Sequence, residues 1–249
     1  MSDRLSVAAL IPVYREPEDM FRQALQSMLL QSRPLDQLVV VDDSGAGTYE
    51  RLVKITMERL GVSCKLEYVR NPVNLGLVKS LNAGLAACTT DVVARMDADD
   101  ISLPYRIDIQ LEKISEGYEL VGGGIVKFGN GNLIPIRYPH SRLKMLVAFM
   151  KSNPFAHPTV MFRRASIQAL GGYREVAHAE DLDLWIRCLR NNIRMTNVLL
   201  PVLMYRLHAQ QVSEIHRSVQ RHSTRIVRRQ VASALLERLV SKVYSWRNT

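Results

Sequence analysis

The sequence predicts an α/β protein whose core is a mostly parallel, twisted sheet with helices packed on its faces. Over the first hundred residues, short apolar runs alternate with segments that carry an apolar residue every three or four positions. This alternation is typical of strand–helix–strand units with right-handed crossovers. The apolar runs are almost uninterrupted, as expected for strands buried on both faces. A chain of 249 residues, 47% apolar and 23% charged, is large enough to bury such a core.

The first half of the chain supplies the parallel strands. Residues 7–13 form the first apolar run, and Pro17 then opens a helical pattern in a first turn, where proline is tolerated. The further strands are expected at 37–42, 65–69 and 91–96, and the helices between the four strands at 17–29, 48–60 and 77–87.

The second half of the chain mixes the two periods. A hairpin is expected where Gly-Asn-Gly at 129–131 joins two extended segments. The expected elements are a helix at 103–116, hairpin strands at 119–128 and 132–138, a helix at 141–151, a short strand at 159–162, a helix at 181–189, an extended segment at 197–205 and a long helix over 213–246. Neither an internal repeat nor a linker rich in Pro, Gly or Ser divides the chain.

Cysteine usage and hydropathy bear on the compartment. Cys64, Cys88 and Cys188 lie far apart and match no C-x-x-C or zinc-ligand pattern, which favours a reducing compartment, most simply the cytosol. Apolar runs all fall short of the roughly 18–20 residues that a membrane span needs, and the N-terminus lacks a signal-peptide core. We therefore expect a protein that neither spans a membrane nor is exported.

Acidic residues gather where the expected strands end. The second strand ends at Asp42 and Asp43, and the fourth is followed by Asp97, Asp99 and Asp100. Because ligands of open parallel sheets collect at the carboxyl ends of the strands, these five carboxylates would share one rim. They repel each other unless a cation or hydrogen-bond donors offset their charge, and an all-oxygen cluster favours Mg²⁺ or Mn²⁺.

Common nucleotide-binding motifs are absent from the sequence. It contains no G-x-x-x-x-G-K-[ST] and no G-x-G-x-x-G after the first strand, which argues against P-loop and dinucleotide chemistry. The rim instead favours a diphosphate neutralised by metal, with Asp42 or Asp43 available to bond a ribose or a base.

Each of these candidate motifs also has a purely structural interpretation. Asp97-Ala-Asp99 can mark a strand-to-turn boundary, but its place directly after a buried strand favours metal binding. The segment 74–76 (Asn-Leu-Gly) can simply cap the third helix. Glu180 and Asp181 open a helix, where acids complement the helix dipole and where a general base is equally consistent with the residues.

Taken together, the motifs resemble family 2 glycosyltransferases of the GT-A fold. The matching segments are Ile-Pro-Val-Tyr-Arg-Glu at 11–16, Val-Val-Asp-Asp-Ser at 40–44, Asn-Leu-Gly at 74–76, Arg-Met-Asp-Ala-Asp-Asp at 95–100, His-Pro-Thr-Val-Met-Phe-Arg-Arg at 157–164, Gly-Gly-Tyr at 171–173, Ala-Glu-Asp-Leu-Asp-Leu-Trp at 179–185 and Tyr-Arg-Leu-His at 205–208. The likeness spans about residues 7–213, and the order and spacing of the segments make it specific. It is strongest to bacterial enzymes that build O-antigen, capsule or exopolysaccharide.

This resemblance implies roles for individual residues. Asp97 would face the ribose, Asp99 would bind Mn²⁺ or Mg²⁺ between the two phosphates, and His208 would complete the metal site. Asp181 would be the catalytic base, with Glu180 beside it. The residues implied to contact the nucleotide are Pro12, Tyr14, Glu16, Asp42, Asp43, Asn74, Gly76, Lys79, Asp97 and Asp99, with Lys79 standing where the family more often has arginine.

The resemblance also implies an organisation and a reaction. A GT-A domain would occupy residues 1–212, with a nucleotide-binding half at about 1–100 and an acceptor half at 101–212. The pattern of the remaining residues, outside the resemblance, predicts a basic amphipathic helix at 213–249. The reaction would move a sugar from a nucleoside-diphosphate sugar, most simply a UDP-sugar, to an acceptor hydroxyl with inversion. The acceptor would be a saccharide or a lipid-linked saccharide, at the inner face of the cytoplasmic membrane.

The net charge of +9 is concentrated near the C-terminus. Residues 206–249 hold nine Lys and Arg against two Glu, with apolar residues in an approximate helical stripe. Such a helix can pack on its own domain, join subunits of an oligomer or dock on an anionic membrane. Nucleic acid is not an expected partner, because few aromatic residues accompany the basic ones.

Two other functions remain as alternatives. A nucleotidyltransferase would need a loop rich in glycine and basic residues after the first strand, and Val-Tyr-Arg-Glu-Pro at 13–17 is not such a loop. A non-catalytic nucleotide-sugar binding protein would tolerate the loss of Asp99, Asp181 and His208, which this chain retains.

Overall fold

The computed structural model describes residues 4–129, 131–207, 224 and 227. The strands are β1 (Val7–Val13), β2 (Gln37–Asp42), β3 (Lys65–Arg70), β4 (Val92–Arg95), β5 (Ile101–Ser102), β6 (Leu120–Phe128), β7 (Ile134–Ile136), β8 (Met161–Arg163) and β9 (Met195–Arg206). The helices are α1 (Glu18–Leu29), α2 (Glu50–Leu60), α3 (Leu77–Ala87), α4 (Arg106–Ser115), α5 (Arg142–Lys151), α6 (Arg164–Ala169), α7 (Glu180–Arg190) and a 3₁₀ turn η1 (His157–Thr159).

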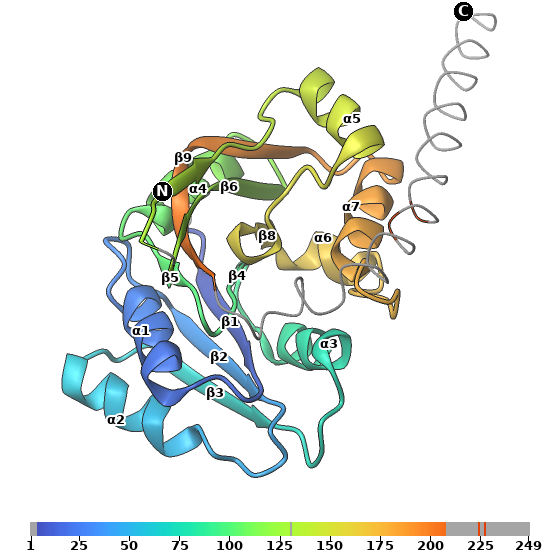
Figure 1. The fold of residues 1–249 in the computed structure, drawn as a ribbon. Coiled ribbons are helices and arrows are strands. Elements are labelled where there is room, and N and C mark those ends of the chain that lie inside the picture. Colours follow the sequence, from blue (N-terminus) through green and yellow to red (C-terminus); the bar gives the residue numbers. More distant parts are fainter. Residues whose placement is uncertain (1–3, 130, 208–223, 225–226, 228–249) are drawn as a thin grey trace, which may run out of the picture.

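A single sheet runs through the molecule in the order β3-β2-β1-β4-β8-β6-β9-β5, with β7 paired to β6 (Figure 1). The first four strands of this order are parallel, as predicted. β8 then lies antiparallel between β4 and β6, β9 runs parallel to β6, and β5 is antiparallel to β9. The predicted α/β class is confirmed, and the expected hairpin is the β6–β7 pair.

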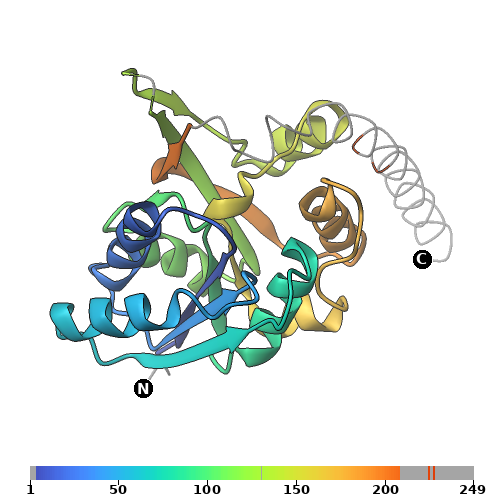
Figure 2. The same cartoon turned by 60° about the horizontal axis from the view of Figure 1, so that its bottom comes forward.

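Two hydrophobic cores lie on the two faces of this sheet, and β1 contributes to both. Val7, Ala9 and Ile11 point into a core shared with α1, α2 and α4. Ala8 and Leu10 point the other way, into a core shared with α3, α5, α6 and α7. This alternation explains the nearly continuous apolar run of β1, since every side chain of the strand is buried. Figures 1 and 2 show the helices on both sides of the sheet.

Two glycines allow neighbouring elements to pack closely against the sheet. A Cβ added to Gly84 in α3 would collide with the Leu10 side chain, so α3 rests directly on β1. A Cβ on Gly122 in β6 would collide with Asn197 and Phe155, so β9 and the chain after α5 press against this strand. The glycine run in β6 therefore serves packing within the second half of the chain.

Only Thr224 and Val227 of the expected C-terminal helix are described. Both residues are helical, and Val227 is 3% exposed within the core on the α7 face. The rest of the segment 213–249 lies outside the described residues. Among the helices that are described, none has the length and apolar character needed to cross a membrane.

Candidate active site

A cluster of three carboxylates lies directly after β4. The side-chain oxygens of Asp97, Asp99 and Asp100 come within 4.8 Å of one another. All three donors are hard oxygen ligands, which suit Mg²⁺ or Mn²⁺. The acidic triplet thus fits a divalent cation.

Arg95, the last residue of β4, pairs with the first acid of this cluster. Its Nη2 donates to Asp97 Oδ1 at 2.5 Å, and the Arg95 side chain is 1% exposed. Burial raises the pKa of Asp97, against the opposing effect of the Arg95 charge. The guanidinium is therefore the fixed cation of the site.

Arg206 at the end of β9 closes the acidic cluster from the far half of the chain. Its backbone N–H donates to Asp100 Oδ1 at 2.9 Å, and its Nε donates to the Asp99 carbonyl at 2.8 Å. Among the described residues, the buried Oδ2 of Asp100 finds no hydrogen-bond partner. Burial, then Asp97 and Asp99, raises the pKa of Asp100. A buried carboxylate oxygen without a donor is a second feature that fits a cation at this position.

Glu16 brings the loop after β1 to the same place. Its carboxylate accepts the Tyr14 N–H at 2.7 Å, and its carbonyl accepts the Tyr49 hydroxyl at 2.8 Å. The pKa of Glu16 is raised, mainly by burial and further by the charges of Asp99 and Asp97. Glu16 therefore lies within electrostatic reach of the acidic cluster. Pro12 is buried in β1, in register with β2.

Asp43 holds a loop of its own chain in this structure. Its carboxylate accepts Asn71 Nδ2 at 2.7 Å, Leu75 N–H at 2.8 Å and Gly76 N–H at 2.9 Å. The side chain of Asn74 also accepts the Gly76 N–H, at 2.9 Å. The segment 74–76 therefore enters α3 through a turn that Asp43 anchors.

Asp42 is likewise engaged by its own chain. It is fully buried and accepts Ser44 N–H at 2.8 Å and the Tyr68 hydroxyl at 2.5 Å. Burial is the largest reason why the pKa of Tyr68 is raised, followed by the bond to Asp42. A direct contact of Asp42 or Asp43 with a base or ribose stays a prediction. Lys79 lies apart from these acids, 3.7 Å from Glu175 on the surface.

The acids at the start of α7 form the second group of the site. Asp181 accepts Asn153 Nδ2 at 2.5 Å and Leu182 N–H at 2.6 Å, and burial raises its pKa. The pKa of Glu180 is raised to about 7, by burial first and then by Asp181. Arg95 lowers the pKa of both acids, which places them within electrostatic reach of its guanidinium.

Both acidic groups thus lie within electrostatic reach of the buried Arg95 guanidinium. Asp97 bonds to Arg95, and the charge of Asp97 also raises the pKa of Glu180. The two groups come from opposite halves of the chain, 80 or more positions apart in the sequence. This arrangement combines a carboxylate cluster that fits a cation with a second pair of acids whose pKa values are raised.

Sequence analysis assigned no role to several residues of this site. His157 Nε2 lies 3.1 Å from the Tyr173 hydroxyl, and burial, then Arg95, lowers the pKa of His157 so that the ring is neutral. Arg95 could have been identified from the sequence, because an arginine inside a buried strand needs a charged or polar partner. Asn153 could not, because its partner Asp181 lies 28 residues further along the chain.

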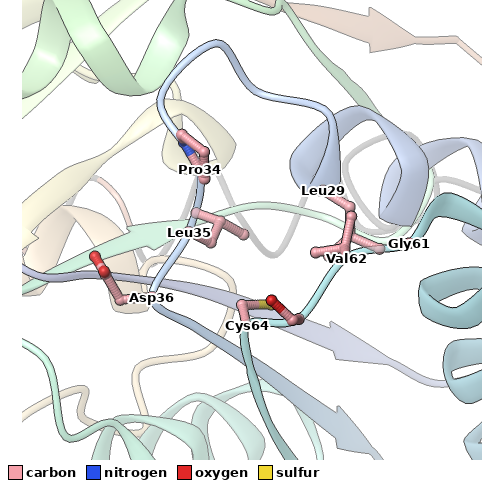
Figure 3. A pocket seen from close by; sticks show the side chains of 8 residues that line it. Leu29, Pro34, Leu35, Asp36, Gly61, Val62 and Cys64 are labelled. Carbon is pink, nitrogen blue, oxygen red and sulfur yellow. The ribbon is translucent and has the colours of Figure 1, made fainter.

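One predicted residue and one hollow in the structure remain separate from this geometry. His208 lies outside the described residues. A hollow of about 430 Å³ opens instead at the opposite edge of the sheet, where residues such as Leu35, Asp36, Val62 and Cys64 precede β2 and β3 (Figure 3). It lies at the amino ends of these strands and is not part of the acidic site.

Known proteins are similar to this chain in sequence and in fold. The family model described as glycosyl transferase family 2 matches residues 8–171. The amylovoran biosynthesis glycosyltransferase AmsE of Erwinia amylovora is 33% identical over 206 residues, covering 81% of this chain and 76% of that protein. The O-antigen biosynthesis glycosyltransferase WbnJ of Escherichia coli is 38% identical over 135 residues, which is 52% of each chain.

Solved structures share the fold at low sequence identity. TarS of S. aureus (residues 1–349, in complex with UDP-GlcNAc) matches with a TM-score of 0.66 and 18% identity, covering 83% of this chain and 60% of that one. A longer TarS chain matches over 88% of this chain and 41% of its own length, so this chain spans less than half of that protein. The fold is therefore the GT-A fold, and the acidic triplet stands at the edge where the parallel strands of that fold end. The chain belongs to glycosyl transferase family 2 and is a glycosyltransferase.

Proposed function

We propose that this protein moves a sugar from a UDP-sugar to a hydroxyl of a lipid-linked saccharide, with inversion at the anomeric carbon, in bacterial surface polysaccharide synthesis. The observation that carries the proposal is that the acidic triplet and the Glu180–Asp181 pair both lie within electrostatic reach of Arg95. TarS was solved with UDP-GlcNAc, which supports a UDP-sugar donor. A relative 28% identical over 201 residues is the E. coli UDP-Gal:alpha-D-GlcNAc-diphosphoundecaprenol beta-1,3-galactosyltransferase, which supports a lipid-linked acceptor.

The proposed cofactor is Mn²⁺ or Mg²⁺, held by Asp97, Asp99 and Asp100, with His208 as a further candidate ligand. The cluster of oxygens and the unpartnered Asp100 Oδ2 support this assignment. When bound there, the cation would neutralise the charge that develops on the leaving diphosphate.

The donor nucleotide would lie along the carboxyl ends of β1 to β4. The loop after β1 would contribute Tyr14 and Glu16, beside Pro12, and the turn into α3 would contribute Asn74, Gly76 and Lys79. Asp42 and Asp43 would act there mainly through the loops that they hold. Asp97 would face the ribose.

Asp181 would remove the proton of the acceptor hydroxyl. One of its oxygens is fixed by Asn153, so the carboxylate has a defined orientation. Its raised pKa makes it a stronger base than an exposed aspartate. The anomeric carbon becomes oxocarbenium-like, as in glycoside hydrolysis, and a single displacement that needs only one carboxylate inverts it. Glu180 is a second ionisable carboxyl group next to this proposed base in the sequence.

The proposal is tested by incubating the purified protein with Mn²⁺ and with UDP-, GDP- or dTDP-sugars, and measuring the nucleoside diphosphate released. We expect slow hydrolysis of a UDP-sugar that EDTA and Asp99→Ala abolish. Asp108→Asn, a change at an exposed acid of α4, serves as the matched control and should leave hydrolysis intact. Absence of both hydrolysis and metal-dependent nucleotide binding would contradict the proposal.

The compartment follows from the acceptor in this proposal. A lipid-linked saccharide that meets a nucleotide sugar does so at the inner face of the cytoplasmic membrane. Cys64, Cys88 and Cys188 are unpaired, which agrees with a reducing compartment.

A further inference from the structure

Helix α5 exposes an apolar stripe. Leu143, Val147 and Met150 are 73%, 49% and 48% exposed. At about 100° per residue these three side chains fall within about 60° of one another around the helix axis. The opposite side of the helix is buried through Met145 and Phe149, so the stripe is the outer face of a helix that is already anchored in the core.

Basic residues border this stripe on both sides. Lys144 and Lys151 project to one side of it and Arg142 to the other, and all three are exposed. The chain around α5 has an unusual charge, because eight Lys and Arg and no Asp or Glu lie between Glu119 and Glu175. The outer face of α5 is therefore apolar in the middle and positive at its margins.

Exposed apolar residues also occur on β9, the strand along which the chain before α5 runs. The chain just before α5 runs along β9, where Thr196 Oγ1 donates to the His140 carbonyl at 2.9 Å and Asn197 Nδ2 to the Pro139 carbonyl at 2.7 Å. Next along β9, Leu199 and Leu200 are 62% and 55% exposed. Figures 1 and 2 both place α5 at the end of the molecule away from α2.

We infer that the outer face of α5, together with Leu199 and Leu200, docks on a bilayer surface that contains anionic lipid. Apolar side chains enter the boundary of headgroups and acyl chains, while flanking Lys and Arg meet anionic headgroups. This inference goes beyond the proposed transfer reaction, since vesicle binding requires neither donor nor acceptor.

The charge of the α5 face favours an anionic membrane over another copy of this chain or the chain's own C-terminal segment as its partner. A second copy on a two-fold axis would set the same positive margins against each other, which is unfavourable. The chain's own segment 208–249 is also positive, with eight Lys and Arg against two Glu. An anionic surface is the occupant whose charge complements this face.

Docking at this face would present the site to a lipid-linked acceptor. Asn153 lies two residues beyond the end of α5 and donates to Asp181 Oδ2. The helix on the bilayer and the proposed base are thus joined by a short piece of chain.

The test is co-sedimentation of the full chain with vesicles of phosphatidylcholine alone, or of phosphatidylcholine and phosphatidylglycerol in equal parts. We expect binding to the anionic vesicles only. With about fivefold in affinity per basic residue near the surface, Arg142→Gln/Lys144→Gln should bind about 25-fold more weakly. Arg51→Gln/Arg59→Gln, a matched double change on exposed positions of α2, should bind as the parent does. Equal binding by both double variants would overturn the inference and assign any membrane contact to another surface.

Two further readouts separate the other occupants. Val147→Trp should show a blue-shifted emission on anionic vesicles beyond that of the unsubstituted protein, whereas Leu30→Trp, at a 55% exposed position outside α5, should not. No shift at position 147 would overturn the inference. If Leu143→Ser dissociates a dimer while vesicle binding is unchanged, the face contacts a second copy, and the inference is wrong.

Discussion

The Nη2 of Arg95 lies 2.5 Å from Oδ1 of Asp97, where the Arg95 side chain is 1% exposed and the Asp97 side chain 33%. The guanidinium is also close enough to lower the pKa values of Asp181 and Glu180. The Arg95 guanidinium therefore offsets the negative charge of carboxylates after β4 and at the start of α7. Its removal should raise the pKa values of both groups.

Arg95→Met should lower the free energy of unfolding by about 1–3 kcal/mol, because it leaves the half-buried carboxylate of Asp97 without its counter-charge. Urea unfolding followed by circular dichroism measures the change. The matched control is Lys113→Met, which removes the exposed pair with Glu116 and should cost at most about 1 kcal/mol. Equal losses for the two variants would contradict the view that Arg95 is the central counter-charge.

Asp181→Asn should lower turnover by about 10²–10⁴-fold, the usual contribution of a general base. Donor affinity should be largely kept, because the nucleotide is proposed to lie along the carboxyl ends of β1 to β4, where other residues would hold it. Steady-state kinetics and calorimetric titration with UDP separate the two effects, and Asp108→Asn on α4 is the control. An equal collapse of donor affinity would remove Asp181 from the role of base.

Glu180→Gln should stabilise the protein at alkaline pH. The pKa of Glu180 is raised to about 7 by burial and by Asp181, so the folded protein binds a proton there more tightly than the unfolded chain. The free energy of unfolding therefore falls as pH rises from about 4.5 to about 7. The Glu180→Gln variant does not lose this stability, because glutamine does not titrate. We expect a gain of about 1–3 kcal/mol at pH 8 and little difference at pH 4, measured by urea unfolding at both pH values. A gain of the same size at both would exclude titration as its cause.

Asp43→Ala should lower the free energy of unfolding by about 2–4 kcal/mol, because three donors lose a charged acceptor. The loop into α3 would lose its anchor, so the KM for the donor should rise as well. Asp108→Ala is again the control, with a change within about 0.5 kcal/mol. If the variant keeps full stability and loses only donor binding, Asp43 contacts the nucleotide directly.

Sequence patterns determined the parallel half of the fold because local signals agreed there. The run of β1 is apolar at every position, and both of its faces are indeed buried. The short strand expected at 159–162 corresponds to β8, but its antiparallel direction escaped such analysis, since the direction of a three-residue strand depends on the neighbours with which it pairs. β5 has two residues and carries no period that could distinguish it from the start of α4.

The site was only partly accessible to sequence analysis. The gathering of Asp97, Asp99 and Asp100 followed from their place after a buried strand, and the structure brings their oxygens together. That Asp42 is engaged by the Tyr68 hydroxyl could not be foreseen, because neighbouring strands bring together side chains 26 positions apart. The partners of a carboxylate are set by tertiary packing, which no local motif encodes.

The contact between β9 and the acidic triplet bears on how the protein matures during synthesis. The β3-β2-β1-β4 sheet is complete in sequence once residue 95 has left the ribosome, whereas the donors to Asp99 and Asp100 come from Arg206, more than one hundred residues later. Domains acquire their contacts as the chain emerges from its N-terminal end. The acids therefore gain this partner only after residue 206 has emerged, and a nascent chain keeps an incomplete acidic cluster until β9 has been made.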